Sequence, residues 1–167
     1  MKFEDALAKV LEHEGGFVDD TRDPGGMTCL GVTKTVWQEW VGHPVTEKEM
    51  KALTPEKVAP LYKRKYWDKV KADQLPDGLD YSVFDFAVNS GPGRAIKLLQ
   101  SCVDVKIDGD IGPVTIAAIK AANPRKLVFL YNDARLAFLR SLPHWDVYGK
   151  GWGKRVAEVT QAAIAVA

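Results

Sequence analysis

The stretch DYSVFDFAVNSGPG, from Asp80 to Gly93, is the feature that most constrains the fold of this chain. Read as a helix, it is apolar on nearly every side, whereas a helix at a protein surface carries a single apolar stripe. Such a helix has to be surrounded by other elements, and the run Ser90-Gly91-Pro92-Gly93 ends it. We therefore expect a mainly helical protein built around one buried central helix.

Helical spacing of apolar residues predicts further helices before and after this one. The first begins near Phe3 and ends at Gly15-Gly16. The last is expected from about Trp152 to the end of the chain. N-cap residues mark where four others begin: Thr33, Thr46 with Glu49 in a capping box, Thr54 before Pro55, and Asn123 before Pro124.

The segment from Phe17 to Val32 interrupts the helices and is rich in turn residues. Thr28, Leu30 and Val32 alternate within it, which predicts a short β hairpin. The fold class is thus mainly α, in the α+β sense, with a small N-terminal β hairpin. A length of 167 residues suits one domain, and no long linker or repeat divides the chain.

Composition excludes several classes of partner. Lys plus Arg (23) nearly balances Asp plus Glu (22), so a nucleic-acid binder, which usually carries a basic excess, is not expected. The start, MKFEDALAKV, has no apolar core of a signal peptide, and no run approaches the roughly 20 apolar residues that span a bilayer. We expect synthesis in the cytoplasm, no stable membrane insertion, and reduced thiols at Cys29 and Cys102, with a disulfide as the alternative.

Glu14 is the first candidate for chemistry. Together with Phe3, Leu7 and Val10 it falls on one helix face, so it continues an apolar stripe. It also lies in the last helical turn, where the helix dipole is negative. Both effects favour the protonated carboxyl that a general acid needs. The structural alternative is a solvated residue before a glycine cap.

Four further residues, all later in the sequence than Glu14, extend this candidate site. Gly15 and Gly16 either cap the helix or leave room for a substrate beside the glutamate. Asp23 lies in a turn and Thr28 at the root of the hairpin, and a hairpin folded against the helix end would bring both close to Glu14. Two carboxylates in different protonation states are the working unit of most glycoside hydrolases. Asp23 is equally explained as an ordinary turn residue.

The buried central helix carries a second polar pair. Asp85 and Asn89 are four residues apart and share a helix face. A carboxylate between Phe84 and Phe86 needs a partner or a water-filled cleft, and an ion pair, with Arg135 as one candidate, is favoured over catalysis. Asp85 and Asn89 are both candidates for substrate binding, and Asn89 is expected to bind a sugar or to cap the helix.

Aromatic residues supply the remaining substrate-binding candidates. Phe17 and Trp67 are expected to stack on sugar rings, as are Tyr66 and Tyr131, although most aromatic residues belong in the core. No cofactor or metal is expected. The three histidines lack ligand spacing, and DGDIG lacks the later acidic ligands of a calcium loop.

The motif EGGFVDDTRDPGGMTCLGVT, from Glu14 to Thr33, resembles the entry motif of glycoside hydrolase family 108. These proteins are lysozyme-like N-acetylmuramidases of phage endolysins and of bacterial loci once labelled secretion activators. DYSVFDFAVNSGPGRAIKLLQ followed by DGDIGPVTIAAI resembles the predicted peptidoglycan-binding region of the same proteins. The resemblance implies one lysozyme-like domain over 1–167, with the catalytic motifs in 1–90 and a peptidoglycan-binding-like helical region packed on them in 91–167.

The resemblance also implies a reaction. Glu14 matches the catalytic glutamate, and the substrate would be the β-1,4 bond between N-acetylmuramic acid and N-acetylglucosamine. By analogy with phage lysozymes, Asp23 and Thr28 would position water or stabilise the oxocarbenium charge. Phe17 stands where the family more often has Tyr. We expect an inverting outcome, because nothing in the sequence places two carboxylates about 5 Å apart, as a retaining enzyme requires.

Two other functions fit the same sequence. One is a non-catalytic protein that binds peptidoglycan or assists secretion, and the other is a lytic transglycosylase, which uses one glutamate and no activated water. The expected partner in every case is the peptidoglycan glycan strand, bound by a monomer. Action in the periplasm, or after release from the cell, would then need a holin or another dedicated export route.

Overall fold

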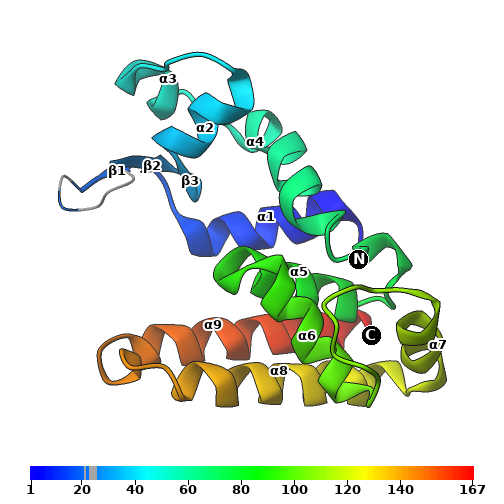
Figure 1. Cartoon of the computed structure of the whole chain (residues 1–167). Coiled ribbons are helices and arrows are strands. Elements are labelled where there is room, and N and C mark those ends of the chain that lie inside the picture. The colour runs from blue at the N-terminus through cyan, green and yellow to red at the C-terminus, as the bar shows by residue number, and fades with distance from the viewer. Residues whose placement is uncertain (21, 23–25) are drawn as a thin grey trace. The chain divides into compact units, whose positions relative to one another are not determined.

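A computed structural model gives the structure of the chain, and it describes residues 1–20, 22 and 26–167. The described chain forms two compact units, Lys2–Lys65 and Tyr66–Ala167, and Met1 belongs with the second. Figure 1 shows the elements of both units. The described residues are mostly helical, with a small antiparallel sheet, and they have the expected lysozyme-like α+β fold.

Within its described residues, the first unit has four α-helices and a small sheet. Its elements are α1 (Phe3–Glu14), β1 (Val18–Asp19), β2 (Met27–Cys29), β3 (Val32–Thr33), α2 (Lys34–Val41), α3 (Glu47–Lys51) and α4 (Pro55–Tyr62). Helix α1 packs against α4, and α3 packs against β2. The apolar stripe of α1 is buried, which explains why the N-terminal periodicity predicted this helix correctly.

The predicted caps are present. The Thr33 hydroxyl accepts a hydrogen bond from the backbone N–H of Val36 at 3.1 Å, which begins α2. Thr46 and Glu49 form the capping box of α3, each side chain accepting from the other residue's backbone N–H. The side-chain oxygens of Thr54 and Asn123 each accept one hydrogen bond, from the backbone N–H groups of Lys57 and Lys126. Such caps depend on residues three apart in sequence, so they can be read without tertiary information.

The predicted hairpin is part of a three-stranded antiparallel sheet in the order β1-β2-β3. Thr28 on the central strand lies opposite both Val18 and Thr33. Leu30 and Gly31 form the turn between β2 and β3, with φ of 50° and 74°. Two consecutive positive φ values are typical of the two-residue turns that match strand twist. The Tyr62 hydroxyl donates a hydrogen bond to the Leu30 carbonyl at 2.7 Å and so ties this turn to α4.

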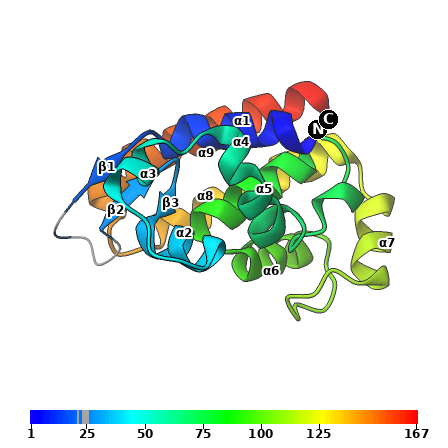
Figure 2. The same cartoon turned by 90° about the horizontal axis from the view of Figure 1, so that it is seen from above.

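The second unit surrounds a central helix. A π-helical turn (Lys63–Trp67) leads into it, followed by η2 (Ala72–Gln74), α5 (Leu79–Ser90), α6 (Pro92–Cys102), α7 (Pro113–Ala121), α8 (Pro124–Arg140) and α9 (Trp145–Val166). Every residue from Leu79 to Ala87 is buried, and α5 contacts α6, α8 and α9. The prediction of a buried central helix is confirmed. Helices α8 and α9 pack along one another (Figures 1 and 2).

The loop between α6 and α7 carries the DGDIGP sequence, and Gln100 organises it. The buried Gln100 amide donates to Asp108 Oδ1 at 2.9 Å, and its carbonyl accepts from the backbone N–H groups of Asp108 and Gly109. The Gln100 and backbone N–H donors lower the pKa of the Asp108 carboxyl. A side chain of α6 therefore holds this loop through hydrogen bonds.

The start of the last helix differs from the prediction. Helix α9 begins at Trp145, seven residues before Trp152. Glycines at 149, 151 and 153 discourage a helix locally, but the Trp145 ring packs on Gly149. A Cβ placed at Gly149 would lie 2.6 Å from that ring. Side-chain packing along the helix therefore outweighs the low helix propensity of glycine.

Candidate active site

Glu14 is the last residue of α1. Phe3, Leu7 and Val10 on the same face are buried, and Glu14 continues this stripe as a half-buried side chain. Gly15 ends the helix with φ of 76°, and its N–H donates to the Leu11 carbonyl at 3.2 Å. The helix therefore stops directly after the carboxylate, which lies at the edge of the buried face.

The turn between β2 and β3 lies against the stem of Glu14. A Cβ placed on Gly31 would be 3.0 Å from both Cβ and Cγ of Glu14 and 2.5 Å from the Tyr62 hydroxyl oxygen. Real Cβ atoms do not tolerate the shorter of these contacts, so Gly31 is the residue that fits here. Tyr62, fully buried on α4, holds the turn through Leu30. Two elements distant in sequence thus confine the Glu14 side chain at its base.

Gly15 and Gly16, which follow the glutamate, are not crowded by any described residue. Among the described residues, nothing lies within 4 Å of a Cβ placed at either position. Gly15 needs its glycine for a positive φ, but Gly16 has no such backbone requirement. Open space at Gly16 fits the role predicted for it, room for a substrate, better than a purely conformational one.

Only one of the two predicted partners of Glu14 belongs to the part of the chain that the structure describes. Asp23 lies outside the described residues. Thr28 is half-buried on β2, the strand that leads into the turn at Gly31. In the neighbouring turn, Asp20 pairs with Arg22 at 3.0 Å, and this hydrogen-bonded pairing lowers the pKa of the Asp20 carboxyl.

Phe17 follows the two glycines and is half-buried. The Lys51 ammonium nitrogen lies 5.1 Å from the centre of its ring, a cation–π contact across the unit. One face of the ring is therefore taken by α3, and a sugar would have to use the other.

In the second unit, Asp85 is held by two arginines. Its carboxylate lies 2.7 Å from Nη1 of Arg135 and 3.0 Å from Nη2 of Arg155, and the side chains of Asp85 and Arg135 are 0% exposed. Desolvation alone would raise the pKa of Asp85, but the charges of Arg135 and Arg155 together hold it below its usual range. The predicted ion pair with Arg135 is present, and both carboxylate oxygens are occupied by protein partners.

Asn89 and Trp67 end up in different environments. Asn89 is exposed one turn after Asp85, and its side-chain oxygen accepts from Arg135 at 3.5 Å. Trp67 is 1% exposed, donates from its indole N–H to Asp73 at 2.8 Å, and meets Phe84 edge to face. Asn89 is thus available to a ligand, whereas the Trp67 ring belongs to the core and offers no face to a sugar.

Three residues were not singled out from the sequence. Arg155, Gly31 and Tyr62 contact the predicted residues through tertiary packing, with no spacing that connects them. For Gly31, the dipeptide Leu30-Gly31 between alternating residues was the available signal, since glycine in a two-residue connection indicates a tight turn.

Comparison with known proteins assigns the first half of the chain to a protein family. The family model described as glycosyl hydrolase 108 matches residues 7–91, which is half of the sequence. The chain belongs to glycosyl hydrolase family 108. In this family 108 protein a second model, described as a predicted peptidoglycan domain, matches residues 94–157. Together the matches make the chain a glycoside hydrolase and support peptidoglycan as its substrate.

A similar solved structure is described as the structure of Brucella abortus SagA. It shares 43% sequence identity with this family 108 protein, over 98% of this chain and 94% of that chain, with a TM-score of 0.86. No significant match was found among curated proteins. The hydrolase match extends through α5, beyond the boundary of the first compact unit at Lys65.

Two further observations concern ligands and membranes. Within residues 1–20, 22 and 26–167, no group of three or more His, Cys, Asp and Glu side chains could hold a metal ion. None of the described helices has the length and apolar character needed to cross a membrane.

Gly31→Ala is expected to lower activity by about 100-fold or more, since a displacement of roughly 1 Å in a catalytic group has that effect. The new Cβ would press on the stem of Glu14. The positive φ adds roughly 1–2 kcal/mol of destabilisation. Hydrolysis of purified peptidoglycan and urea unfolding measure the two effects.

Gly42→Ala is the matched control for this prediction. Gly42 has φ of 81°, but among described residues nothing lies within 4 Å of a Cβ placed there. The control should therefore lose a similar amount of stability and keep its activity. Equal activity loss in both variants would show that Gly31 acts on folding alone.

Proposed function

We propose that this chain is an N-acetylmuramidase that hydrolyses the β-1,4 bond between N-acetylmuramic acid and N-acetylglucosamine in peptidoglycan. The observation that carries the proposal is the setting of Glu14. The turn at Gly31 lies against the base of its side chain, and among the described residues nothing lies within 4 Å of a Cβ placed at Gly16. A single positioned carboxyl group with access for a substrate is what a general acid for glycoside cleavage requires.

In the proposed reaction, Glu14 gives its proton to the glycosidic oxygen as the bond to the N-acetylmuramic acid carbon breaks. Asp23, with Thr28, positions the water that attacks this carbon, accepts the proton that the water loses, and stabilises the developing positive charge. Phe17 and Asn89 are proposed to contact the glycan. Asp85 acts by holding Arg135 and Arg155, because both its oxygens are occupied. We propose inversion at the anomeric carbon, with water attacking directly and no covalent intermediate.

Product analysis of purified peptidoglycan tests this function. Digestion by the wild-type chain, followed by mass spectrometry, should give fragments that end in reducing N-acetylmuramic acid. Reducing N-acetylglucosamine ends would place the cleavage at the other glycosidic bond. Ends carrying 1,6-anhydro rings would make the protein a lytic transglycosylase, and the absence of soluble fragments would make it a binding protein.

The cellular role follows from the same substrate. We propose that the enzyme acts on the cell wall, either as an endolysin or in remodelling the wall for secretion, and that a holin or dedicated exporter delivers it. Expression with and without an appended export signal separates delivery from activity. Lysis only when the chain is exported supports this scheme, and lysis without any route across the membrane contradicts it.

A further inference from the structure

Three aromatic rings line one face at the start of α9. Trp145, Tyr148 and Trp152 are spaced three and four residues apart, so they lie on the same side of the helix. The Tyr148 and Trp152 rings are stacked, with centroids 5.6 Å apart and planes 26° apart. The Trp145 centroid lies 6.2 Å from that of Trp152. These three rings are called the aromatic face below.

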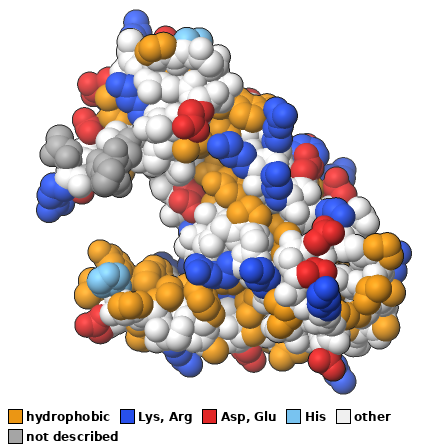
Figure 3. All heavy atoms as spheres, viewed as in Figure 1, with side chains coloured by type: hydrophobic (Ala, Val, Ile, Leu, Met, Phe, Trp, Pro, Cys, Tyr) orange, Lys and Arg blue, Asp and Glu red, His pale blue; other side chains and the backbone are white. Residues whose placement is uncertain are grey.

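The aromatic face lies at the surface. Tyr148 is 55% exposed, and the Trp145 and Trp152 rings are half-buried. Hydrophobic side chains gather over the end of the second unit where α8 passes into α9 (Figure 3). Apolar patches that reach the surface in this way mark interaction sites.

The Trp145 ring is held against its own helix. Trp145 packs on Gly149, where a Cβ would lie 2.6 Å from the ring, and a glycine inside a helix costs about 1 kcal/mol relative to alanine. The Arg140 guanidinium lies 5.8 Å from the centre of the Trp145 ring. The helix thus gives up intrinsic stability at a position that seats this ring.

The chemistry of the rings fits a sugar. Pyranose rings present apolar C–H faces that pack on aromatic side chains, and Tyr148 and Trp152 supply such rings. Among nearby basic side chains, Arg155 is paired with Asp85 and Lys154 with Glu158, so charge does not decide the ligand. Peptidoglycan carries the apolar sugar-ring faces that match the rings.

We propose that the aromatic face is a glycan-binding site, with a pyranose ring of peptidoglycan lying on Tyr148. The peptidoglycan-domain match, residues 94–157, includes all three rings. The proposal rests on the proposed function for its ligand class, peptidoglycan. It does not require Glu14 to be the acid, because binding and cleavage are measured separately.

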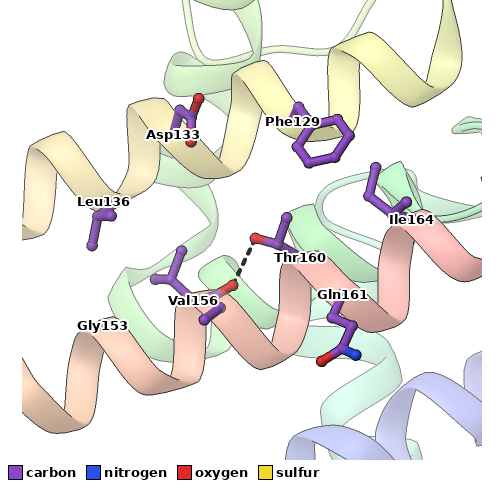
Figure 4. Close-up of a pocket in the computed structure, with 9 residues that line it drawn as sticks. Phe129, Asp133, Leu136, Gly153, Val156, Thr160, Gln161 and Ile164 are labelled. Carbon is purple, nitrogen blue, oxygen red and sulfur yellow. Dashed lines mark hydrogen bonds between the residues drawn. The ribbon is translucent and has the colours of Figure 1, made fainter.

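A second exposed apolar feature of this unit lacks these properties. The groove between α8 and α9, about 500 Å³, is lined by Phe129, Leu136, Val156 and Ile164 (Figure 4). It contains one aromatic ring, and its Thr160 hydroxyl donates back to the Val156 carbonyl at 2.7 Å. No ring pair and no basic side chain lines the groove, so it makes a suitable negative control.

The test measures co-sedimentation of the full chain with insoluble purified peptidoglycan at low temperature, where digestion is slow. Tyr148→Leu keeps an apolar side chain but removes the flat ring, and it should weaken binding about tenfold, the upper range for aromatic contacts. Tyr148→Phe retains the ring and should bind within about twofold of wild type. Phe129→Leu, in the groove, should bind like the wild type.

Several outcomes would overturn the proposal. Unchanged binding by Tyr148→Leu, or an equal loss in Phe129→Leu, would remove the aromatic face as the site. Loss of binding to anionic phospholipid vesicles, without loss of binding to peptidoglycan, would make the face a membrane contact. Circular-dichroism melting of each variant checks folding, and Tyr148 is exposed enough for substitution to leave the fold intact.

This experiment also separates the two proposals. If wild-type chain binds peptidoglycan through Tyr148 but releases no fragments, the proposed function fails and the binding site stands. If Tyr148→Leu releases fragments at the wild-type rate and binds peptidoglycan with the wild-type affinity, the binding site fails and the proposed function stands.

Discussion

Glu14→Gln is expected to lower the rate of peptidoglycan hydrolysis by about 10²- to 10⁴-fold, the usual contribution of a positioned general acid. Glutamine has the same shape, so it keeps the contact of the side-chain stem with the turn at Gly31. It has no proton to give to the departing glycosidic oxygen. The rate of soluble-fragment release from purified peptidoglycan measures this loss.

Glu12→Gln is the matched control. Glu12 lies on the same helix, two residues earlier, and is exposed. It should keep wild-type activity, and both variants should unfold within about 0.5 kcal/mol of wild type, as surface substitutions do. A Glu14→Gln variant that still releases fragments at the wild-type rate would remove Glu14 as the acid.

Asp85→Asn is expected to destabilise the second unit by about 3–5 kcal/mol, the cost of removing one partner of a buried ion pair. Asparagine is nearly the same size, but it leaves the fully buried Arg135 without a counter-charge. Urea unfolding at neutral pH, followed by circular dichroism, gives the change in the free energy of unfolding. Glu47→Gln breaks the exposed Lys51–Glu47 pair and should cost under about 1 kcal/mol.

The same ion pair has a pH dependence of known sign. The pKa of Asp85 is lowered in the folded protein, since its two arginines outweigh desolvation. Its stabilisation is therefore fully present above the unfolded-state pKa of an aspartate, about 3.9, and is lost as pH falls through the lower folded value. Asp85→Asn should lack this acid-dependent loss. Equal stability of wild type and variant at neutral pH would contradict the structural role of Asp85.

Local signals in the sequence were enough for most helices. The apolar stripe of α1, the cap at Thr33 and the capping box at Thr46 all involve residues within one or two helical turns. The buried central helix could also be recognised, because an element without a polar face has to be enclosed. These features predicted the fold class and the position of Glu14 at a helix end.

Features that depend on tertiary contacts were not predictable. Arg135 was one of several possible partners for Asp85, and Arg155 had no signal at all, because neither is near Asp85 in sequence. Trp67 was expected on a sugar but is buried, since composition alone does not separate core rings from surface rings. The aromatic face was missed because glycine-rich sequence concealed the start of α9.

The enclosed position of α5 limits how this protein can be divided or recombined. The hydrolase match ends at residue 91, just after α5, yet the helices that enclose α5 come later in the chain. A fragment cut at this junction would expose Phe86, whose ring packs on Tyr131 and Phe138 of α8, on a helix that is buried along most of its length. The segments matched by the two family models therefore cannot be exchanged as separate domains. A chimera joined at this point would contain an aggregation-prone helix instead of a folded hydrolase domain.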